Sequence, residues 1–259
     1  MARELGLAWR RWVAAALRAA LPSHCALCGM AAGGIICVPC HADYVAPQRP
    51  RCRVCANPVA DHRIRTCGRC LAHPPPFDAT VAAVDYAAPL DRLVLQLKFA
   101  ARLPYATWLA QAMTDAVLAQ PHLELPHVLC PVPLGPKRLA ERGFNQALEI
   151  ARPLSRSLGI PLRPRLACRP LDTRAQSSIS PRERHANLRN AFTLPPESVH
   201  LVRGLHIGVV DDVMTSGHTL AALAATLKRF GAARVTNIVF ARTPPSTDAQ
   251  PETEGNRSV

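Results

Sequence analysis

The sequence is poor in long apolar runs and in acidic residues, and the first shortage already excludes a class of protein. The apolar stretch at residues 13–21 is interrupted by Arg18 and is far shorter than the roughly 20 residues that a helix needs to cross a bilayer. Arg10, Arg11 and Arg18 also break the apolar core that a secretory signal requires. We therefore expect a cytoplasmic protein without a transmembrane segment, in which residues 1–22 form an amphipathic helix.

Acidic residues are scarce relative to basic ones. The 259 residues include 31 Lys and Arg but only 18 Asp and Glu, which gives a formal net charge of +13. Residues 1–75 carry +7 and residues 137–189 carry +8, whereas residues 76–136 carry −2 and residues 190–259 carry 0. Such an excess favours polyanions, either nucleic acid or a small phosphate ester, although a coding bias towards arginine would give the same excess without any function.

The cysteines follow a pattern that is typical of metal binding. Eight of the ten form four Cys-x-x-Cys pairs, with eight, eleven and eleven residues between successive pairs. Two intervening residues let a tight turn aim both thiolates at one ion, and a second pair completes a shell of four sulfurs. Gly29 and Gly68 suit such turns, where a positive φ is useful. The pattern predicts two structural zinc ions, with the ligands Cys25, Cys28, Cys37, Cys40, Cys52, Cys55, Cys67 and Cys70.

Other uses of these cysteines fit the sequence less well. A disulfide framework requires an oxidising compartment, and a thioredoxin-like redox site would be one pair rather than four. Sequential pairing of the four pairs is favoured over cross-bracing, but the sequence leaves both open. Cys130 and Cys168 stand alone and are expected to be small buried residues. The neighbouring arginines either contact nucleic acid or form a solvated basic surface: Arg49, Arg51, Arg53, Arg63, Arg65 and Arg69.

After the cysteine pairs, strand-length and helix-length patterns alternate, which predicts an α/β domain with a parallel sheet. The expected strands lie near residues 79–86, 127–133, 166–169, 205–211 and 234–241. The expected helices lie near residues 89–99, 104–119, 144–158 and 216–230. The predicted organisation is thus a helix at 1–22, a double zinc ribbon at 23–75, the sheet domain at 76–242 and a disordered tail at 243–259.

The most informative stretch is IGVVDDVMTSGHTL at residues 207–220. An apolar run ends in Asp211 and Asp212, and a turn rich in hydroxyls then opens into an alanine-rich helix. Unpaired amides at a helix start bind phosphate, and Gly217 lets the backbone come close. Carboxylates at the end of a strand can accept hydrogen bonds from vicinal sugar hydroxyls or face a divalent cation. The combination predicts a sugar phosphate as ligand, with the phosphate held by Thr215, Ser216, Gly217, His218 and Thr219.

These residues carry a family resemblance. VVDDVMTSGHT resembles the phosphoribosyl pyrophosphate signature of type I phosphoribosyltransferases. Together with the cysteine pairs, PPPFD at 74–78, LKF at 97–99, PVPL at 131–134, RLAERGFNQA at 138–147 and RxQSSIS…RxxNLRNAF at 174–192 resemble the ComF/GntX family over roughly residues 20–242. The resemblance implies a double zinc ribbon joined to a type I phosphoribosyltransferase fold, with a role in DNA uptake for some members.

The resemblance also implies roles for individual residues. Asp211 and Asp212 would hold the ribose hydroxyls, residues 215–219 the 5′-phosphate, and Lys137 and Arg138 the pyrophosphate. A lid would come from the segment containing Gln176, Ser177, Ser178 and Arg182. Arg142, Asn145 and Gln146 are either part of the site or the ordinary polar start of a helix. No catalytic group is assigned.

Three functions remain open at this stage. The first is a phosphoribosyltransferase that uses Mg²⁺ and lets a nitrogen nucleophile displace pyrophosphate. The second is a sensor that binds the same sugar phosphate without turnover. The third is a nucleic-acid handling factor that uses its basic ribbons, with single-stranded DNA or the DNA-uptake machinery as partner.

Overall fold

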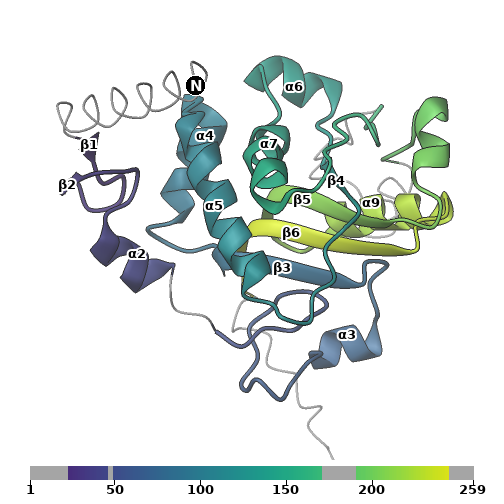
Figure 1. Cartoon of the computed structure of the whole chain (residues 1–259), viewed down its shortest axis with the longest axis horizontal. Helices are drawn as coiled ribbons and strands as arrows, with labels where there is room; N and C mark the ends of the chain where they lie inside the picture. Colours follow the sequence, from purple (N-terminus) through teal and green to yellow (C-terminus); the bar gives the residue numbers. More distant parts are fainter. Residues whose placement is uncertain (1–22, 46–48, 171–190, 245–259) are drawn as a thin grey trace, which may run out of the picture.

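The computed structural model describes residues 23–45, 49–170 and 191–244, and the structural statements below refer to them. They form a four-stranded parallel sheet of order β3-β6-β5-β4 with helices on both faces, preceded by two small cysteine-rich units (Figure 1). The α/β fold class is therefore confirmed. The expected N-terminal helix, the lid residues Gln176, Ser177, Ser178 and Arg182, and the tail beyond residue 244 lie outside the described residues.

Four of the five expected strands are present, and every neighbouring pair is parallel. Their bounds are β3 Ala79–Asp85, β4 Val128–Pro131, β5 His206–Met214 and β6 Arg234–Arg242. β3, β4 and β6 are almost entirely buried, as strands covered on both faces must be. β5 continues to Met214, so the acidic pair lies inside the strand and not, as expected, at its end.

The prediction of a fifth strand at residues 166–169 is wrong. Cys168 makes a single antiparallel bridge with Thr193, in which each amide donates to the other residue's carbonyl oxygen. The next hydrogen-bonded positions on either side would need the amides of Pro170 and Pro195. Proline has no N–H to donate, so the ladder stops after one pair.

The four helices expected in the sheet domain are present, and α6 and a 3-10 turn are additional. The bounds are α4 Asp91–Ala100, α5 Pro104–Leu118, α6 Pro136–Arg142, α7 Gln146–Leu158 and α9 His218–Arg229, with a 3-10 turn at Pro196–Leu201. The helix expected at 144–158 is preceded by the separate helix α6, which ends at Gly143 with a φ of 79°. Asn145 then caps α7 by accepting hydrogen bonds from the amides of Ala147 and Leu148. Within the described ranges, no helix has the length and apolar character needed to span a bilayer.

Two apolar clusters, one on each face of the sheet, form the core. Side chains of α4, α5 and α7 pack on one face around residues such as Leu97, Ile150 and Val210. The other face is covered by α9, whose Leu223 packs near Val209, and by the second cysteine-rich unit. Figure 1 shows α5 and α7 on one side of the sheet and α3 on the other.

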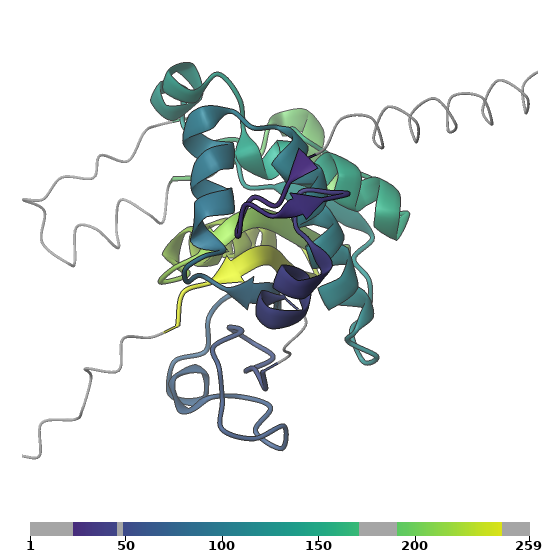
Figure 2. The same ribbon diagram turned by 90° about the vertical axis from the view of Figure 1, so that its left-hand side faces the viewer.

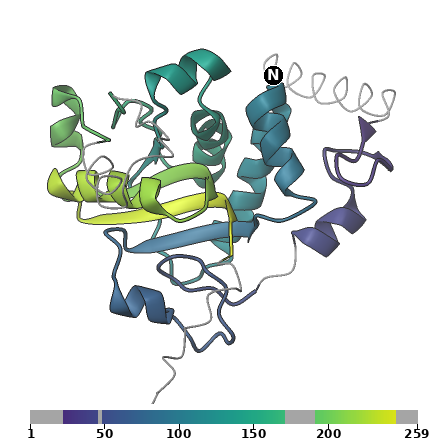
Figure 3. The ribbon, with the colours of Figure 1, turned by 180° about the vertical axis from the view of Figure 1, so that it is seen from behind.

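The two cysteine-rich units occupy different places. The first ribbon (residues 23–45) contains β1 Ser23–His24, β2 Ala31–Ala32 and α2 Val38–Tyr44, and the second ribbon (residues 49–73) contains α3 Gly68–Ala72. Figures 2 and 3 show the first ribbon beside the helices α4 and α5, and the second ribbon beyond the edge strand β3. Thr80 of β3 donates from its amide to the Arg53 carbonyl at 3.0 Å and from its hydroxyl to the Val54 carbonyl at 2.7 Å. The second ribbon is therefore hydrogen-bonded to the sheet.

A buried histidine at the start of β5 predicts how stability depends on pH. His206 is 5% exposed, and its Nε2 lies 2.8 Å from the Thr236 hydroxyl. Burial, together with the nearby Arg234 and His127, lowers the pKa of His206 to about 4, while Glu124 and Asp78 act in the opposite direction. The unfolded chain, with an ordinary histidine pKa near 6.5, binds the proton first as the pH falls. The free energy of unfolding should therefore decrease from about pH 6.5 down to about pH 4.

Denaturant titrations at several pH values check this prediction. His206→Gln should flatten the pH slope in that window, whereas His122→Gln, at an exposed position, should leave it unchanged. Loss of metal at low pH should affect the wild type and both variants alike. The difference between the pH slopes of the wild type and His206→Gln therefore reports on His206 alone. Identical slopes for the wild type and His206→Gln would contradict the prediction.

Candidate functional site

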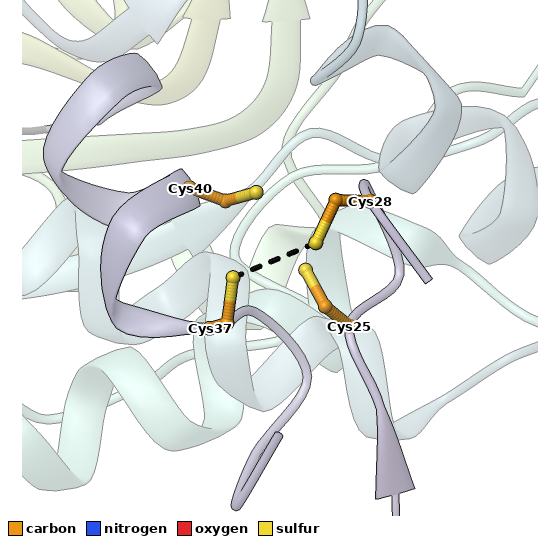
Figure 4. A group of neighbouring side chains, drawn as sticks. All are labelled: Cys25, Cys28, Cys37 and Cys40. Carbon is orange, nitrogen blue, oxygen red and sulfur yellow. Dashed lines mark hydrogen bonds between the residues drawn. The ribbon is translucent and has the colours of Figure 1, made fainter. Parts of the chain in front are cut away.

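The eight paired cysteines form two separate clusters. Cys25, Cys28, Cys37 and Cys40 form one and Cys52, Cys55, Cys67 and Cys70 the other, with all sulfurs of a cluster within 4.8 Å of one another. The sulfurs of Cys28 and Cys37 are 3.7 Å apart (Figure 4), and those of Cys55 and Cys67 are 3.6 Å apart. A tetrahedron with Zn–S bonds of about 2.3 Å has edges of about 3.8 Å, whereas a disulfide would need about 2.05 Å. The pairing is sequential, and each cluster fits one zinc ion.

Both clusters use the same local backbone. In the first ribbon the Gly29 amide donates to the Cys25 carbonyl, and Gly29 has a φ of 76°. In the second ribbon the equivalent bond runs from Ala56 to Cys52, and Ala56 has a φ of 57°. The role expected for Gly68 is wrong, because Gly68 begins α3 and the positive φ of the second ribbon belongs to Ala56. The alanine shows that tertiary packing can maintain this turn without glycine.

In each cluster backbone amides lower the pKa of one thiol, Cys25 in the first and Cys52 in the second. Burial alone would raise the pKa of the Cys25 thiol, but N–H groups of Cys28 and Cys37 outweigh it and lower that pKa to about 6. A thiolate is the form that binds a metal. Cys130 lies outside both clusters and is buried, as expected, and burial raises its pKa to about 12. The same expectation for Cys168 is wrong, because that side chain is only partly buried. Both clusters contain cysteines only, and four histidines near them in the sequence belong to neither: His24, His41, His62 and His73.

The different burial of the two clusters predicts two rates of zinc loss. Cys28 of the first ribbon is exposed, whereas Cys52 and Cys55 of the second are 0% and 1% exposed. A chelator should therefore remove one zinc ion per chain quickly and the other slowly, which a colorimetric zinc dye would follow. Cys37→Ser should abolish the fast phase and Cys67→Ser the slow phase. A single phase that both variants reduce equally would contradict two independent sites.

The two acids are consecutive residues near the end of β5. Asp212 points to the face that α4 and α7 cover, where Lys98 and Gln146 contact it. Asp212 is 2% exposed; its Oδ1 accepts a hydrogen bond from Gln146 Nε2 at 3.1 Å, and its Oδ2 is ion-paired with Lys98 Nζ. Burial and the charge of Asp212 raise the pKa of Asp211 well above its usual range, while Lys98 lowers it. The pair thus requires a nearby cation to remain ionised.

The β5–α9 turn, formed by Thr215, Ser216 and Gly217, follows directly. Gly217 has a φ of 83° and precedes α9, whose first hydrogen bond runs from the Ala221 amide to the Gly217 carbonyl. The amides before Ala221 have no acceptor inside the helix, which is the arrangement that binds anions. The positive φ of Gly217 lies in the left-handed region that disfavours a side chain, so the tight turn favours glycine; a Cβ there would also lie 2.6 Å from Met214 Cε, the flexible end of a side chain.

A cavity of about 260 Å³ brings the acids and the turn together. Its charged lining consists of Lys98, Arg138, Arg169, Asp211 and Asp212, and its other polar groups include Tyr86, Gln146, Thr215 and Thr219. Three cations against two acids give the cavity a positive balance that suits a phosphate ester. A second hollow of about 370 Å³ lies between Ala26 of the first ribbon and α4, and neither acid of β5 lines it.

Of the remaining site residues predicted from the sequence, the structure places some in the cavity and others outside it. Arg138 lines the cavity, whereas Lys137 is exposed on α6 with its Nζ 3.8 Å from a Glu141 carboxylate oxygen. Asn145 is the cap of α7 and also donates to the Val132 carbonyl at 3.0 Å. Arg142 donates to the Gln146 side-chain oxygen, so it supports the residue that contacts Asp212.

Three cavity residues were not found from the sequence: Tyr86, Lys98 and Arg169. Of these, only Lys98 could have been identified from the sequence, because it belongs to the LKF motif and follows Leu97 in the last turn of a helix. A lysine beside a buried helical stripe is most often solvated, and only the fold places it against Asp212.

Comparisons with known proteins agree with this geometry. The double zinc ribbon domain profile matches residues 16–71, and the phosphoribosyl transferase domain profile matches residues 145–254. DNA utilization protein YhgH of Salmonella typhimurium (strain LT2) is 40% identical over 203 residues, which are 77% of this chain and 87% of that protein. The chain belongs to the ComF/GntX family. Another relative, Competence protein F of Haemophilus influenzae, is 34% identical over 185 residues, which are 70% of this chain and 80% of that protein.

Solved structures add little beyond this assignment to the ComF/GntX family. The glutamine phosphoribosylpyrophosphate amidotransferase of B. subtilis matches 52% of this chain and 26% of that chain, with 18% identity and a TM-score of 0.36. We base no argument on a similarity at that level. The two domain profiles and the two relatives are sufficient for the family, because together they cover both the ribbons and the sheet domain.

Proposed function

We propose that this ComF/GntX protein binds phosphoribosyl pyrophosphate with Mg²⁺ at the carboxyl end of β5 and transfers the phosphoribosyl group to a nitrogen acceptor. The observation that supports this best is the single cavity onto which Asp211, Asp212 and the β5–α9 turn all open. A phosphate site and a pair of carboxylates a few residues apart match the two ends of a ribose 5-phosphate.

Each part of the ligand has a candidate partner. Residues 215–219 would bind the 5′-phosphate through amides and hydroxyls, and Asp211 and Asp212 would accept hydrogen bonds from the ribose hydroxyls. Arg138, at the cavity wall, would contact the pyrophosphate, and Arg169 lines the same cavity. Lys137 would join them only after leaving Glu141. The proposed lid, with Gln176, Ser177, Ser178 and Arg182, would exclude water from the bound ligand.

Lys98 has a specific part in this proposal. It neutralises Asp212 in the free protein, so ligand binding must either keep that ion pair or replace it. The two carboxylates are hard oxygen donors of the kind that suit Mg²⁺, which would supply positive charge for the pyrophosphate that leaves. Lys98, which lines the same cavity, would then be released from Asp212 and could contact the ligand phosphates.

The proposed transfer needs no covalent enzyme intermediate. The bond from the anomeric carbon to the pyrophosphate oxygen breaks with its electron pair going to pyrophosphate, and the acceptor nitrogen forms the new bond and loses its proton. The positive charge that develops on the ribose ring is stabilised by nearby carboxylates, and the cations of the cavity stabilise the leaving group. Catalysis would thus be electrostatic.

Calorimetric titration with phosphoribosyl pyrophosphate and Mg²⁺ tests the binding step. Asp211→Asn and Asp212→Asn should each weaken binding by about tenfold to a hundredfold, because each removes a charged hydrogen-bond acceptor. Asp115→Asn removes the same charge from an exposed position on α5 and should bind like the wild type. Wild-type protein that gives no heat at millimolar ligand would overturn the proposal.

A second assay separates a transferase from a sensor by measuring pyrophosphate release with a panel of nucleobases and amines as acceptors. If no acceptor causes release, the transfer step is refuted and only the binding of the sugar phosphate remains.

A second function is favoured by the exposed arginines of the second ribbon. Arg53, Arg63, Arg65 and Arg69 are exposed, whereas Arg51 is ion-paired with Asp85 at 2.8 Å. The relatives are called DNA utilization protein and Competence protein F. We propose that this surface binds the phosphates of single-stranded DNA without reading bases.

Fluorescence anisotropy with a labelled oligonucleotide, measured over a range of salt concentrations, tests the DNA proposal. Replacing Arg63 and Arg65 with glutamine should lower the slope of log affinity against log salt by about 1.4, or about 0.7 per lost contact to a single strand. Replacing Arg92 and Arg156, which are exposed on α4 and α7, should not change the slope. Affinity that is independent of salt would refute an electrostatic DNA site.

A further inference from the structure

Arg242, the last residue of β6, links the second ribbon to the β5–α9 turn. It is 2% exposed, and its Nε donates to the Cys55 carbonyl at 3.0 Å. Its Nη1 donates to the Met214 carbonyl at 3.0 Å and also to the carbonyl oxygens of Thr215 and Thr243. One guanidinium therefore contacts both the metal-binding loop of the second ribbon and the turn proposed to bind phosphate.

The setting of this guanidinium is unusual for a buried charge. A buried cation normally needs an anionic partner, because desolvation costs several kcal/mol. Among the described residues, no carboxylate lies within ion-pair distance of Arg242. A zinc ion with four thiolates carries a net charge of 2 − 4 = −2, and the ligand Cys55 lies directly behind the carbonyl that Arg242 contacts. The zinc-loaded cluster would thus supply the missing counter-charge.

The contacts of Arg242 help to fix where two amides point, together with the Thr243 amide, which donates to the Met214 carbonyl at 3.0 Å. A peptide unit is planar and trans, so its C=O and N–H point in opposite directions. Drawing the carbonyls of Met214 and Thr215 towards Arg242 turns the amides of Thr215 and Ser216 the other way, away from the second ribbon. Gly217 then follows with its positive φ. The donors of the β5–α9 turn are therefore oriented from behind by Arg242.

The first ribbon has no comparable link in the part of the chain that is described. Its Ala26, Leu27 and Ile36 pack on the apolar cluster of α4 and α5, on the opposite face of the sheet. Cys52 and Cys55, in contrast, belong to the same cluster as Met214 and Leu220, which flank the β5–α9 turn. Two clusters with the same ligand set therefore offer a matched comparison.

We propose that Arg242 is a positioning residue that couples zinc in the second ribbon to anion binding at the β5–α9 turn. Zinc fixes the loop that carries the Cys55 carbonyl, this carbonyl and the cluster charge fix Arg242, and Arg242 fixes the peptide units of residues 214–216. The identity of the anion, phosphoribosyl pyrophosphate, rests on the proposed function. Because coupling between two binding sites is reciprocal, bound ligand must also retain zinc in the second ribbon.

Three variants test the direction of the coupling. Cys67→Ser, which impairs zinc binding in the second ribbon, should raise the Kd for phosphoribosyl pyrophosphate about tenfold, while Cys37→Ser at the equivalent position of the first ribbon should change it less than about twofold. Arg242→Lys should keep two zinc ions per chain but also raise the Kd about tenfold, because an ammonium cannot reproduce the fork of the guanidinium. Equal effects of the two cysteine variants, or wild-type affinity in Arg242→Lys, would overturn the proposal.

Two further measurements test the coupling, and the first needs no variant. In wild-type protein, phosphoribosyl pyrophosphate should slow the slow phase of chelator-driven zinc release several-fold and leave the fast phase unchanged; equal slowing of both phases, or of neither, would count against coupling. Without ligand, hydrogen exchange at the amides of residues 215–219 should be faster in Cys67→Ser than in Cys37→Ser. If the wild type binds no phosphoribosyl pyrophosphate, the proposed function fails, and the exchange comparison alone decides whether zinc orders the turn.

Discussion

All four strands run parallel, and the geometry of the site follows from that constraint. The carboxyl ends of parallel strands lie at the same end of the sheet, so the last residues of β5 and β6 are neighbours there. The register pairs Met214 directly with Arg242, which brings the guanidinium to the turn that follows β5. An antiparallel β6 would place Arg242 at the opposite edge. The acids, the turn and their support from behind are therefore consequences of one pattern of strand pairing.

Local features were predictable from the sequence, and contacts between distant segments were not. The cysteine spacing and the DDVMTSGHT stretch lie within short windows, where turn and helix-start chemistry decides the structure. The partners of Asp212 come from α4 and α7, and no short window relates Lys98 or Gln146 to that carboxylate. Helix α6 was missed because it has only seven residues and none of them is buried, so no apolar period marks it, although Pro136 and Gly143 are ordinary helix start and stop residues.

The net charge of the sequence also overestimates the basic surface that could bind a polyanion, because the sequence does not show which basic residues are used inside the fold. Part of the arginine excess is used inside the protein: Arg51 pairs with Asp85, and Arg242 is buried among carbonyl groups. These side chains are unavailable to a polyanion, so the basic surface is smaller than the formal charge of +13 suggests. Lys98, Arg138 and Arg169 are likewise drawn into one cavity. Where a basic residue lies in the fold therefore matters more than how many there are.

The two edges of the sheet explain why the ribbons are not interchangeable. An exposed edge strand invites pairing with other chains, and both edges are covered. On the β4 side, Leu129 exchanges hydrogen bonds of 2.8 and 2.9 Å with Pro161 and Arg163. On the β3 side the cover is the second ribbon, through the bonds of Thr80 to Arg53 and Val54. Zinc bound by the four cysteines of that cover would fix its shape and so add to the stability of the sheet domain, whereas the first ribbon packs on the helices.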